Sequence, residues 1–232
     1  MCARAIEIGI TDITFTEHLD FCVTDVSFGA FDYSRWMDDL NAAREEFAGR
    51  LIIRRGVEVD YQERFRSQIE DYLGSHEFDY ILGSAHYVNG VILEDHDDYF
   101  PGKSLRDAYI PYFDSVLSAV ETGLFQTLAH VDFCKRHGSR YFGAFRLDDF
   151  HAEVESILKA AIARGMVIEI NTSGLRQPPR ETFPAEETLH LYRELGGREV
   201  VLGSDSHTVE QLGFGLDVGL GLAARAGLRV VL

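Results

Sequence analysis

Imidazole and carboxylate side chains stand at the ends of successive apolar segments of this sequence. These groups are Glu17 and His18, Glu58 and Asp60, His86, His130 and Asp132, Glu169 and Asn171, and Asp205 and His207. Imidazole and carboxylate together suit divalent metals such as zinc, manganese or iron. A single histidine of this kind is more simply explained as a hydrogen-bonded group that lines a cleft. Taken jointly, the four histidines with Glu58 and Asp205 favour a metal site.

The predicted metal ligands all lie at such a segment end, and they are His18, Glu58, His86, His130, Asp205 and His207, with Glu17 as a possible further ligand. Glu58 is suited to bridge two ions because a carboxylate offers two oxygens. Two or three divalent ions close together generate hydroxide at neutral pH and hold an oxyanion, which is the chemistry of phosphate ester hydrolysis. We therefore predict two or three divalent ions (zinc, manganese or iron) as cofactors and Glu58, Asp205 and His207 as catalytic residues.

Basic residues are few near these segment ends, so their positions are informative. Arg176 follows the polar turn 171–174, and an arginine grips phosphate with two parallel donors. We predict Arg176, Ser173 and Asn171 as substrate-binding residues. An ion pair with one of the many carboxylates is the alternative for Arg176, and for Lys135 that alternative is the favoured interpretation.

The elements that position these groups alternate regularly between apolar and helical segments. The apolar segments are 13–16, 51–57, 80–83, 125–129, 167–170 and 200–203, and the segments with helical spacing are 33–47, 61–73, 105–122, 148–164 and 185–195. Parallel neighbouring strands need a crossover connection, so this alternation predicts an α/β fold with a parallel sheet. A barrel fits these units and the apolar tail 228–232 better than an open doubly wound sheet, and the whole chain, 1–232, is expected to form one domain. In a parallel barrel all the carboxyl ends of the strands converge on one rim.

The charge balance restricts the partners. The formal net charge is −16, from 38 acidic and 22 basic side chains, which argues against a nucleic-acid partner because phosphate backbones need a basic face. A small phosphorylated substrate stays possible, since bound cations invert the local field. The apolar runs are too short for a membrane span. Three cysteines without paired spacing imply no disulfide framework and fit a cytoplasmic location.

Six motifs follow one another along the chain, and they are TEHLDF (16–21), GVEVDY (56–61), GSAHY (83–87), HVD (130–132), EINTSGLR (169–176) and GSDSH (203–207). Each motif alone is weak, but the ordered series is specific. It resembles the PHP (polymerase and histidinol phosphatase) superfamily, in particular its histidinol-phosphatase branch, over nearly the whole chain.

The resemblance implies a fold, a metal cluster and a reaction. The fold would be a distorted seven-stranded β/α barrel, similar to a TIM barrel. The ligands would divide among up to three ions, with Glu58 bridging two of them, His86 and His130 on one, Asp205 on another, and His18 and His207 on the third. The implied reaction is hydrolysis of L-histidinol phosphate to L-histidinol and phosphate, in histidine biosynthesis, through attack of a metal-activated hydroxide, with Arg176 holding the phosphoryl oxygens.

The sequence departs from the family pattern at its start. Members of this family open with a strand that carries His-x-His, whereas no histidine precedes His18 here and Met1–Ile10 resembles the end of the following helix. We therefore expect that strand and its two ligands to be absent from the chain as given. A longer gene product is the favoured explanation, because a barrel without this strand exposes two strand edges. The alternatives to a histidinol-phosphatase are a PHP-fold phosphoesterase with another substrate and a catalytically impaired remnant.

Overall fold

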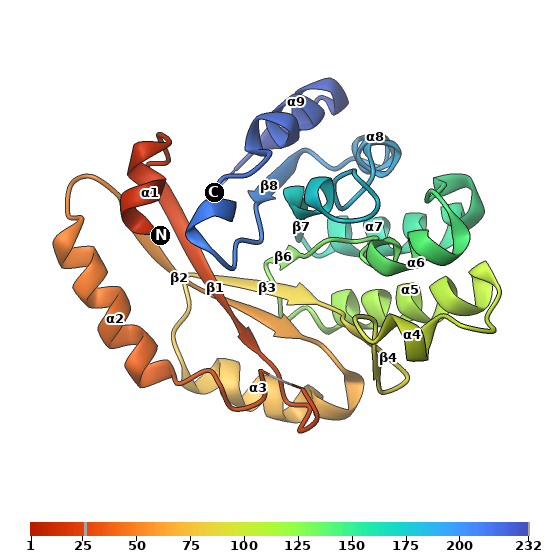
Figure 1. Cartoon of the computed structure of the whole chain (residues 1–232), viewed down its shortest axis with the longest axis horizontal. Coiled ribbons are helices and arrows are strands. Elements are labelled where there is room, and N and C mark those ends of the chain that lie inside the picture. The colour runs from red at the N-terminus through yellow and green to blue at the C-terminus, as the bar shows by residue number, and fades with distance from the viewer. Residues whose placement is uncertain (26, 232) are drawn as a thin grey trace.

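Seven parallel strands form one curled sheet in the computed structural model, which describes residues 1–25 and 27–231 (Figure 1). In their order across the sheet the strands are β1 (Asp12–Leu19), β2 (Ile52–Asp60), β3 (Tyr80–Ser84), β6 (Thr127–Leu128), β7 (Val167–Asn171), β8 (Glu199–Gly203) and β9 (Arg229–Val230). Every pairing in this sheet is parallel. The predicted distorted, barrel-like α/β fold is confirmed. The curled sheet is open between its two edge strands, β1 and β9.

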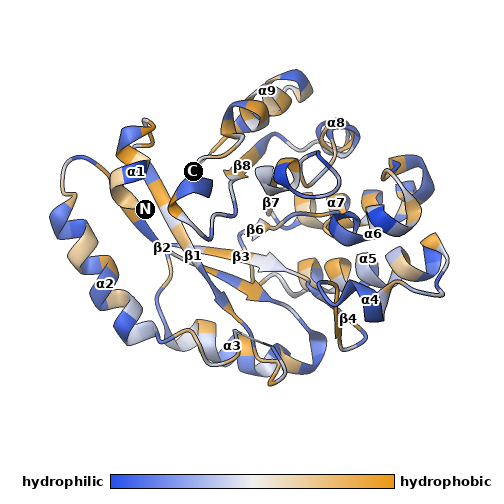
Figure 2. Ribbon diagram, viewed as in Figure 1, coloured by the Kyte–Doolittle hydropathy of each residue, from blue (hydrophilic) through white to orange (hydrophobic). Residues whose placement is uncertain are grey.

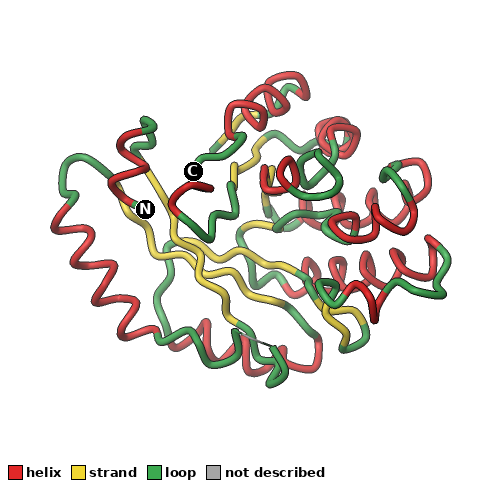
Figure 3. The backbone as a smooth tube through the Cα atoms, viewed as in Figure 1, coloured by secondary structure: helices red, strands yellow, loops and turns green. Residues whose placement is uncertain are grey.

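Helices connect the strands and surround the sheet on its outer side (Figures 1 and 3). The helices are α1 (Cys2–Glu7), α2 (Tyr33–Glu46), α3 (Arg66–Ser75), α4 (His96–Tyr99), α5 (Leu105–Thr122), α6 (Lys135–Phe142), α7 (His151–Ala163), α8 (Glu186–Glu194) and α9 (Leu216–Ala226). The described residues also form short 3-10 turns, namely η1 (Glu63–Phe65), η2 (Leu147–Phe150), η3 (Thr172–Arg176) and η4 (Val209–Gln211). A separate antiparallel hairpin joins β4 (Tyr87–Val88) to β5 (Val91–Ile92). No helix in the described part of the chain is both long and apolar enough to cross a membrane.

Helix α5 shows how local sequence produces these elements. The Ser104 side chain accepts a hydrogen bond from the Asp107 N–H at the start of the helix, and Gly123 ends it in the left-handed conformation (φ +70°). Between these caps a buried stripe faces the core, formed by Ala108, Tyr109, Tyr112, Phe113, Val116, Ala119 and Val120. Figure 2 shows the same division between apolar and hydrophilic sides along other helices, such as α9. Burial of this stripe is what holds α5 against the sheet and α7.

The open side of the sheet forms a groove that leads to the carboxyl ends of the strands. One wall is β1, including Thr14, Thr16 and His18, and the other is β8 and the segment after it, including Gly203 and Asp205. The groove has a volume of about 710 Å³. Because side chains alternate along a strand, the even-numbered residues of β1 share one face. The sheet therefore presents a polar inner surface that ends at the predicted ligands.

Gly83 tests how tightly β3 packs against the segment that precedes β6. A Cβ atom at this position would lie 2.3 Å from the ring of Phe125, which is itself buried. We expect Gly83→Ala to lower the free energy of unfolding by roughly 1–3 kcal/mol, measured by urea denaturation, because the core has to shift. Gly74→Ala on α3 is the matched control, since a Cβ there meets open space. It should leave stability unchanged or raise it by about 0.5–1 kcal/mol. Equal stability of the two variants would contradict the packing described.

Candidate metal centre

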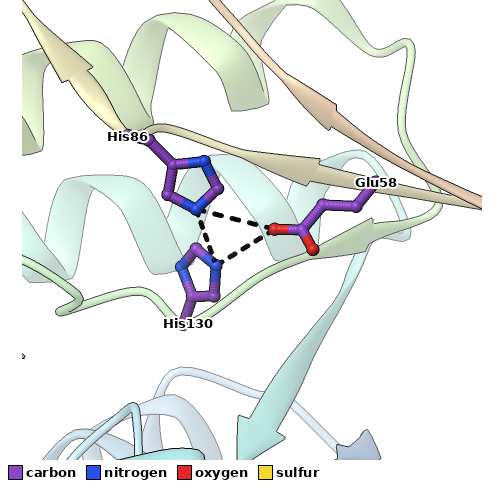
Figure 4. A group of neighbouring side chains, drawn as sticks. All are labelled: Glu58, His86 and His130. Atoms are coloured by element: carbon purple, nitrogen blue, oxygen red, sulfur yellow. Dashed lines mark hydrogen bonds and ion pairs between the residues drawn. The ribbon is translucent and has the colours of Figure 1, made fainter. Parts of the chain in front are cut away.

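A carboxylate and two imidazoles converge at the carboxyl ends of β2, β3 and β6 (Figure 4). Glu58 lies on β2, His86 follows β3 and His130 follows β6. The Oε1 atom of Glu58 lies 3.2 Å from Nε2 of His130 and 3.7 Å from Nε2 of His86. The two Nε2 atoms lie 3.3 Å apart. All three residues are buried. The predicted convergence of these three residues is thus what the fold produces.

The spacing of these three atoms fits a metal ion. Ligand atoms of a tetrahedral zinc site stand about 3.3 Å apart, because each lies about 2.0 Å from the ion. The three observed separations, 3.2, 3.3 and 3.7 Å, are close to this value. A single cation placed among them would contact all three ligand atoms at once. Glu58, His86 and His130 can therefore hold a divalent cation.

Burial and charge set the protonation of the three groups. Burial lowers the pKa of His86 to about 4, which leaves a neutral imidazole of the kind that binds metals. Burial also opposes a charge on His130, but the hydrogen bond with Glu58 and the negative charges of Glu58, Glu169 and Asp205 together outweigh it and raise the pKa to about 9. Burial alone would raise the pKa of Glu58, yet His18 and His130 lower it below its ordinary range. A proton held between Glu58 and His130 thus competes with a cation for the same two atoms.

Neighbouring buried groups fix the two histidines in place. The Asp60 carboxylate accepts the His86 backbone N–H at 2.7 Å, and the Glu169 carboxylate accepts the His130 backbone N–H at 3.1 Å. The hydroxyl of Tyr112 donates to the carbonyl of His130 at 3.2 Å and accepts the N–H of Phe133 at 3.1 Å. Such partners orient metal ligands and hold them in one arrangement.

The other predicted ligands lie along the same groove. His18 sits beside Glu58 in the pairing of β1 with β2, and its ring centroid lies 6.0 Å from that of His86 and 5.8 Å from that of His207. The Oδ1 atom of Asp205 lies 3.4 Å from Nδ1 of His207. His18 thus stands between the buried group at Glu58 and the pair at the end of β8. Glu17 is exposed and also lines the groove, beside His18 on β1.

The predicted substrate-binding residues lie at the end of β7 and in η3, where they form hydrogen bonds with the protein itself. The Asn171 side chain accepts the backbone N–H of Ser173 at 3.0 Å, and both residues are buried. The Arg176 guanidinium donates to the backbone carbonyls of Ser204 and Asp205. Asp205 has a left-handed backbone (φ +48°), so Arg176 supports a strained turn in this geometry. Its contact with phosphate stays a prediction.

Lys135 forms the ion pairs that its sequence context favours. It is completely buried, and its Nζ atom lies 2.9 Å from Asp132 and 3.2 Å from Glu181. The same Asp132 carboxylate accepts the N–H of Ala185 at 2.8 Å. Lys135 therefore ties the turn after His130 to the segment before α8.

Residues 1–173 match the PHP domain family. The chain belongs to this family. Among its relatives, the "Probable histidinol-phosphatase" of Deinococcus radiodurans is 28% identical over 228 residues, which cover 90% of this chain and 80% of that protein. The "Histidinol-phosphatase" of Lactococcus lactis is 26% identical over 209 residues, with 90% and 77% covered.

Solved structures share the fold of this PHP chain. The histidinol phosphate phosphatase of Lactococcus lactis, crystallised with zinc, L-histidinol and phosphate, has a TM-score of 0.88 at 24% identity and covers 99% of this chain and 87% of its own. A second structure, a putative histidinol phosphatase of Listeria monocytogenes, has a TM-score of 0.76 at 22% identity, with 94% and 92% covered. These likenesses show the curled β/α architecture of the family.

Two carboxylates of this PHP site were not among the ligands predicted from the sequence. Asp60 and Glu169 are both buried and both bond to the backbone of a predicted ligand, His86 and His130 respectively. A signal was present, because Asp60 is two residues from Glu58 and Glu169 is two residues from Asn171. A spacing of two puts both side chains of each pair on the inner face of a strand.

The proton between Glu58 and His130 makes metal binding depend on pH. His130 has its pKa raised to about 9, so below that pH a bound metal must displace a proton. We expect the apparent affinity for manganese to rise with pH, by up to about tenfold per unit between about pH 6 and about pH 8. Isothermal titration calorimetry in two buffers of different ionisation enthalpy measures both the affinity and the proton release. An affinity that does not change over this range would contradict the arrangement.

Proposed function

We propose that this chain is a metal-dependent phosphomonoesterase, a histidinol-phosphatase that hydrolyses L-histidinol phosphate to L-histidinol and phosphate. One observation carries the proposal: Glu58, His86 and His130 present three buried ligand atoms 3.2–3.7 Å apart at the carboxyl ends of the strands. In a barrel-like α/β fold, active sites lie at this end. The similarity to proteins named histidinol-phosphatases supports the substrate. We assign the whole chain, 1–232, to one such domain.

Two or three divalent cations are the proposed cofactors. Glu58, His86 and His130 would hold one ion, and His18, Asp205 and His207 supply ligands for the others. When bound, divalent cations supply an activated water at neutral pH and positive charge opposite the phosphoryl oxygens. Zinc is supported by its presence in the Lactococcus lactis structure, and manganese and iron suit the same nitrogen and oxygen donors.

The charge of the groove supports a role for cations in substrate binding. Carboxylates line it at five positions: Asp12, Glu17, Glu58, Glu169 and Asp205. Among the described residues that line it there is no lysine or arginine side chain. A phosphate group could enter such a groove only if bound cations reverse the local field. Within this site, Glu58, Asp205 and His207 are the proposed catalytic residues, and Arg176, Ser173 and Asn171 the proposed substrate-binding residues.

Release of inorganic phosphate from L-histidinol phosphate tests the proposed function. We expect turnover with added zinc or manganese and its loss with a chelator. His86→Ala and Asp205→Asn should each lower kcat/KM by more than the ~10–100-fold that loss of an outer partner of a metal ligand costs. His190→Ala, at an exposed position on α8, is the matched control and should leave turnover unchanged.

The outcome of this assay separates the possible functions. Retained turnover in His86→Ala or Asp205→Asn would overturn the assigned roles. Turnover of other phosphomonoesters or phosphodiesters in a substrate panel, with none of L-histidinol phosphate, would overturn the substrate and leave the phosphoesterase. Absence of turnover with all substrates at saturating metal would contradict the enzyme assignment.

A further inference from the structure

Glu169 is a buried carboxylate that lines the groove, and it has no role in the proposed function. The residue is 5% exposed and lies on the inner face of β7, where it lines the groove with Glu58 and Asp205. Its Oε2 atom accepts the backbone N–H of His130 at 3.1 Å and the side-chain amide of Asn171 at 3.2 Å. No group among the described residues donates a hydrogen bond to Oε1. One oxygen is therefore fixed by the protein, and the other is left free.

The free oxygen rests against Gly203 on the neighbouring strand. A Cβ atom at Gly203 would lie 1.8 Å from Oε1 of Glu169, so the carboxylate occupies the space that any other residue would fill. Asn171 pairs with Gly203 across β7 and β8. Glu169 lies two residues before Asn171, on the same inner face of β7. Asp205 lies two residues after Gly203, beyond the end of β8, and lines the same groove as Glu169. The absence of a side chain at Gly203 therefore leaves room for the Glu169 carboxylate on the groove wall that Asp205 also lines.

Electrostatics agree with this proximity. Burial is the main cause that raises the pKa of Glu169, and the charges of Glu58 and Asp205 raise it further, while His130 lowers it. Three carboxylates that share one groove repel one another unless a cation lies among them. Among the described residues that line the groove, no lysine or arginine is present to compensate this negative charge.

We propose that Glu169 and Asp205 form a second cation subsite of the metal centre, opened by Gly203. Glu169 then has two functions: its Oε2 positions the main chain of His130, and its Oε1 binds a divalent cation. The subsite lies beside the group formed by Glu58, His86 and His130 and takes the same class of metal, since carboxylate oxygens suit manganese and zinc. This inference rests on the metal centre of the proposed function.

Glu169→Gln separates the two functions of this residue. Glutamine keeps a carbonyl oxygen that can accept the His130 N–H, but it lacks the negative charge. We expect the variant to bind manganese at least tenfold more weakly at one of its sites, measured by calorimetry, and to gain less thermal stability from added manganese. Its stability in the presence of chelator should equal or exceed that of the unaltered chain, because a buried charge has been removed.

Two further variants complete the design. Gly203→Ala should weaken manganese binding as well, since its methyl group displaces the Glu169 carboxylate. The double variant should bind no more weakly than the weaker single variant, because both changes act on one subsite. Glu155→Gln, at a half-buried position on α7 where the carboxylate pairs with Lys159, makes the same change in net charge and should bind manganese as the unaltered chain does.

The results distinguish this inference from the proposed function. Manganese binding by Glu169→Gln that matches the unaltered chain in affinity and stoichiometry would overturn the subsite, whether or not phosphate is released. An unaltered chain that binds manganese in this Glu169-dependent way but hydrolyses no L-histidinol phosphate would support the subsite and overturn the function. An unaltered chain that binds no manganese would overturn both.

Discussion

A carboxylate and two imidazoles lie within 3.2–3.7 Å of one another at Glu58, His86 and His130, and all three are buried. Groups of this kind are costly to bury unless a proton or a cation joins them. The surrounding structure maintains the arrangement rather than relieving it: Asp60 and Glu169 hold the backbone of the two histidines. The cost of burying these groups together explains why the inner face of the sheet is polar at this point: the fold concentrates negative charge where a metal ion can compensate it.

The sheet makes this concentration possible through its topology. Parallel strands in consecutive order bring their carboxyl ends to one edge, so residues far apart in sequence become neighbours. The open side between β1 and β9 carries the same polar face down to the ends of the strands, as a groove of about 710 Å³. Within the groove, Gly203 helps to set the position of the Glu169 carboxylate, since a side chain at Gly203 would collide with it.

Much of the fold could be predicted from the alternation of apolar and helical segments, and the strand regions and the five predicted helices are confirmed. Helices α6 and α9 were missed for a physical reason. Polar residues dominate the first, and the second contains glycines, one of which, Gly219, packs closely against Leu202 and Thr172. Tertiary packing overrides their weak helix propensity. The β4–β5 hairpin did carry a signal, Asn89-Gly90, both residues having positive φ. In the site, residue type and position at a strand end predicted the convergence of Glu58, His86 and His130. The strand spacing also signalled that Glu169 faces inward, but the backbone groups with which Glu169 and Arg176 form hydrogen bonds depend on the tertiary structure.

The location of bound metal is the most direct test of this account. Crystals soaked in manganese or zinc should show an anomalous difference peak among Oε1 of Glu58 and the Nε2 atoms of His86 and His130, about 2.0–2.3 Å from each. Peaks confined to exposed carboxylates, with none at this position, would contradict the assignment of the buried triad as a metal centre.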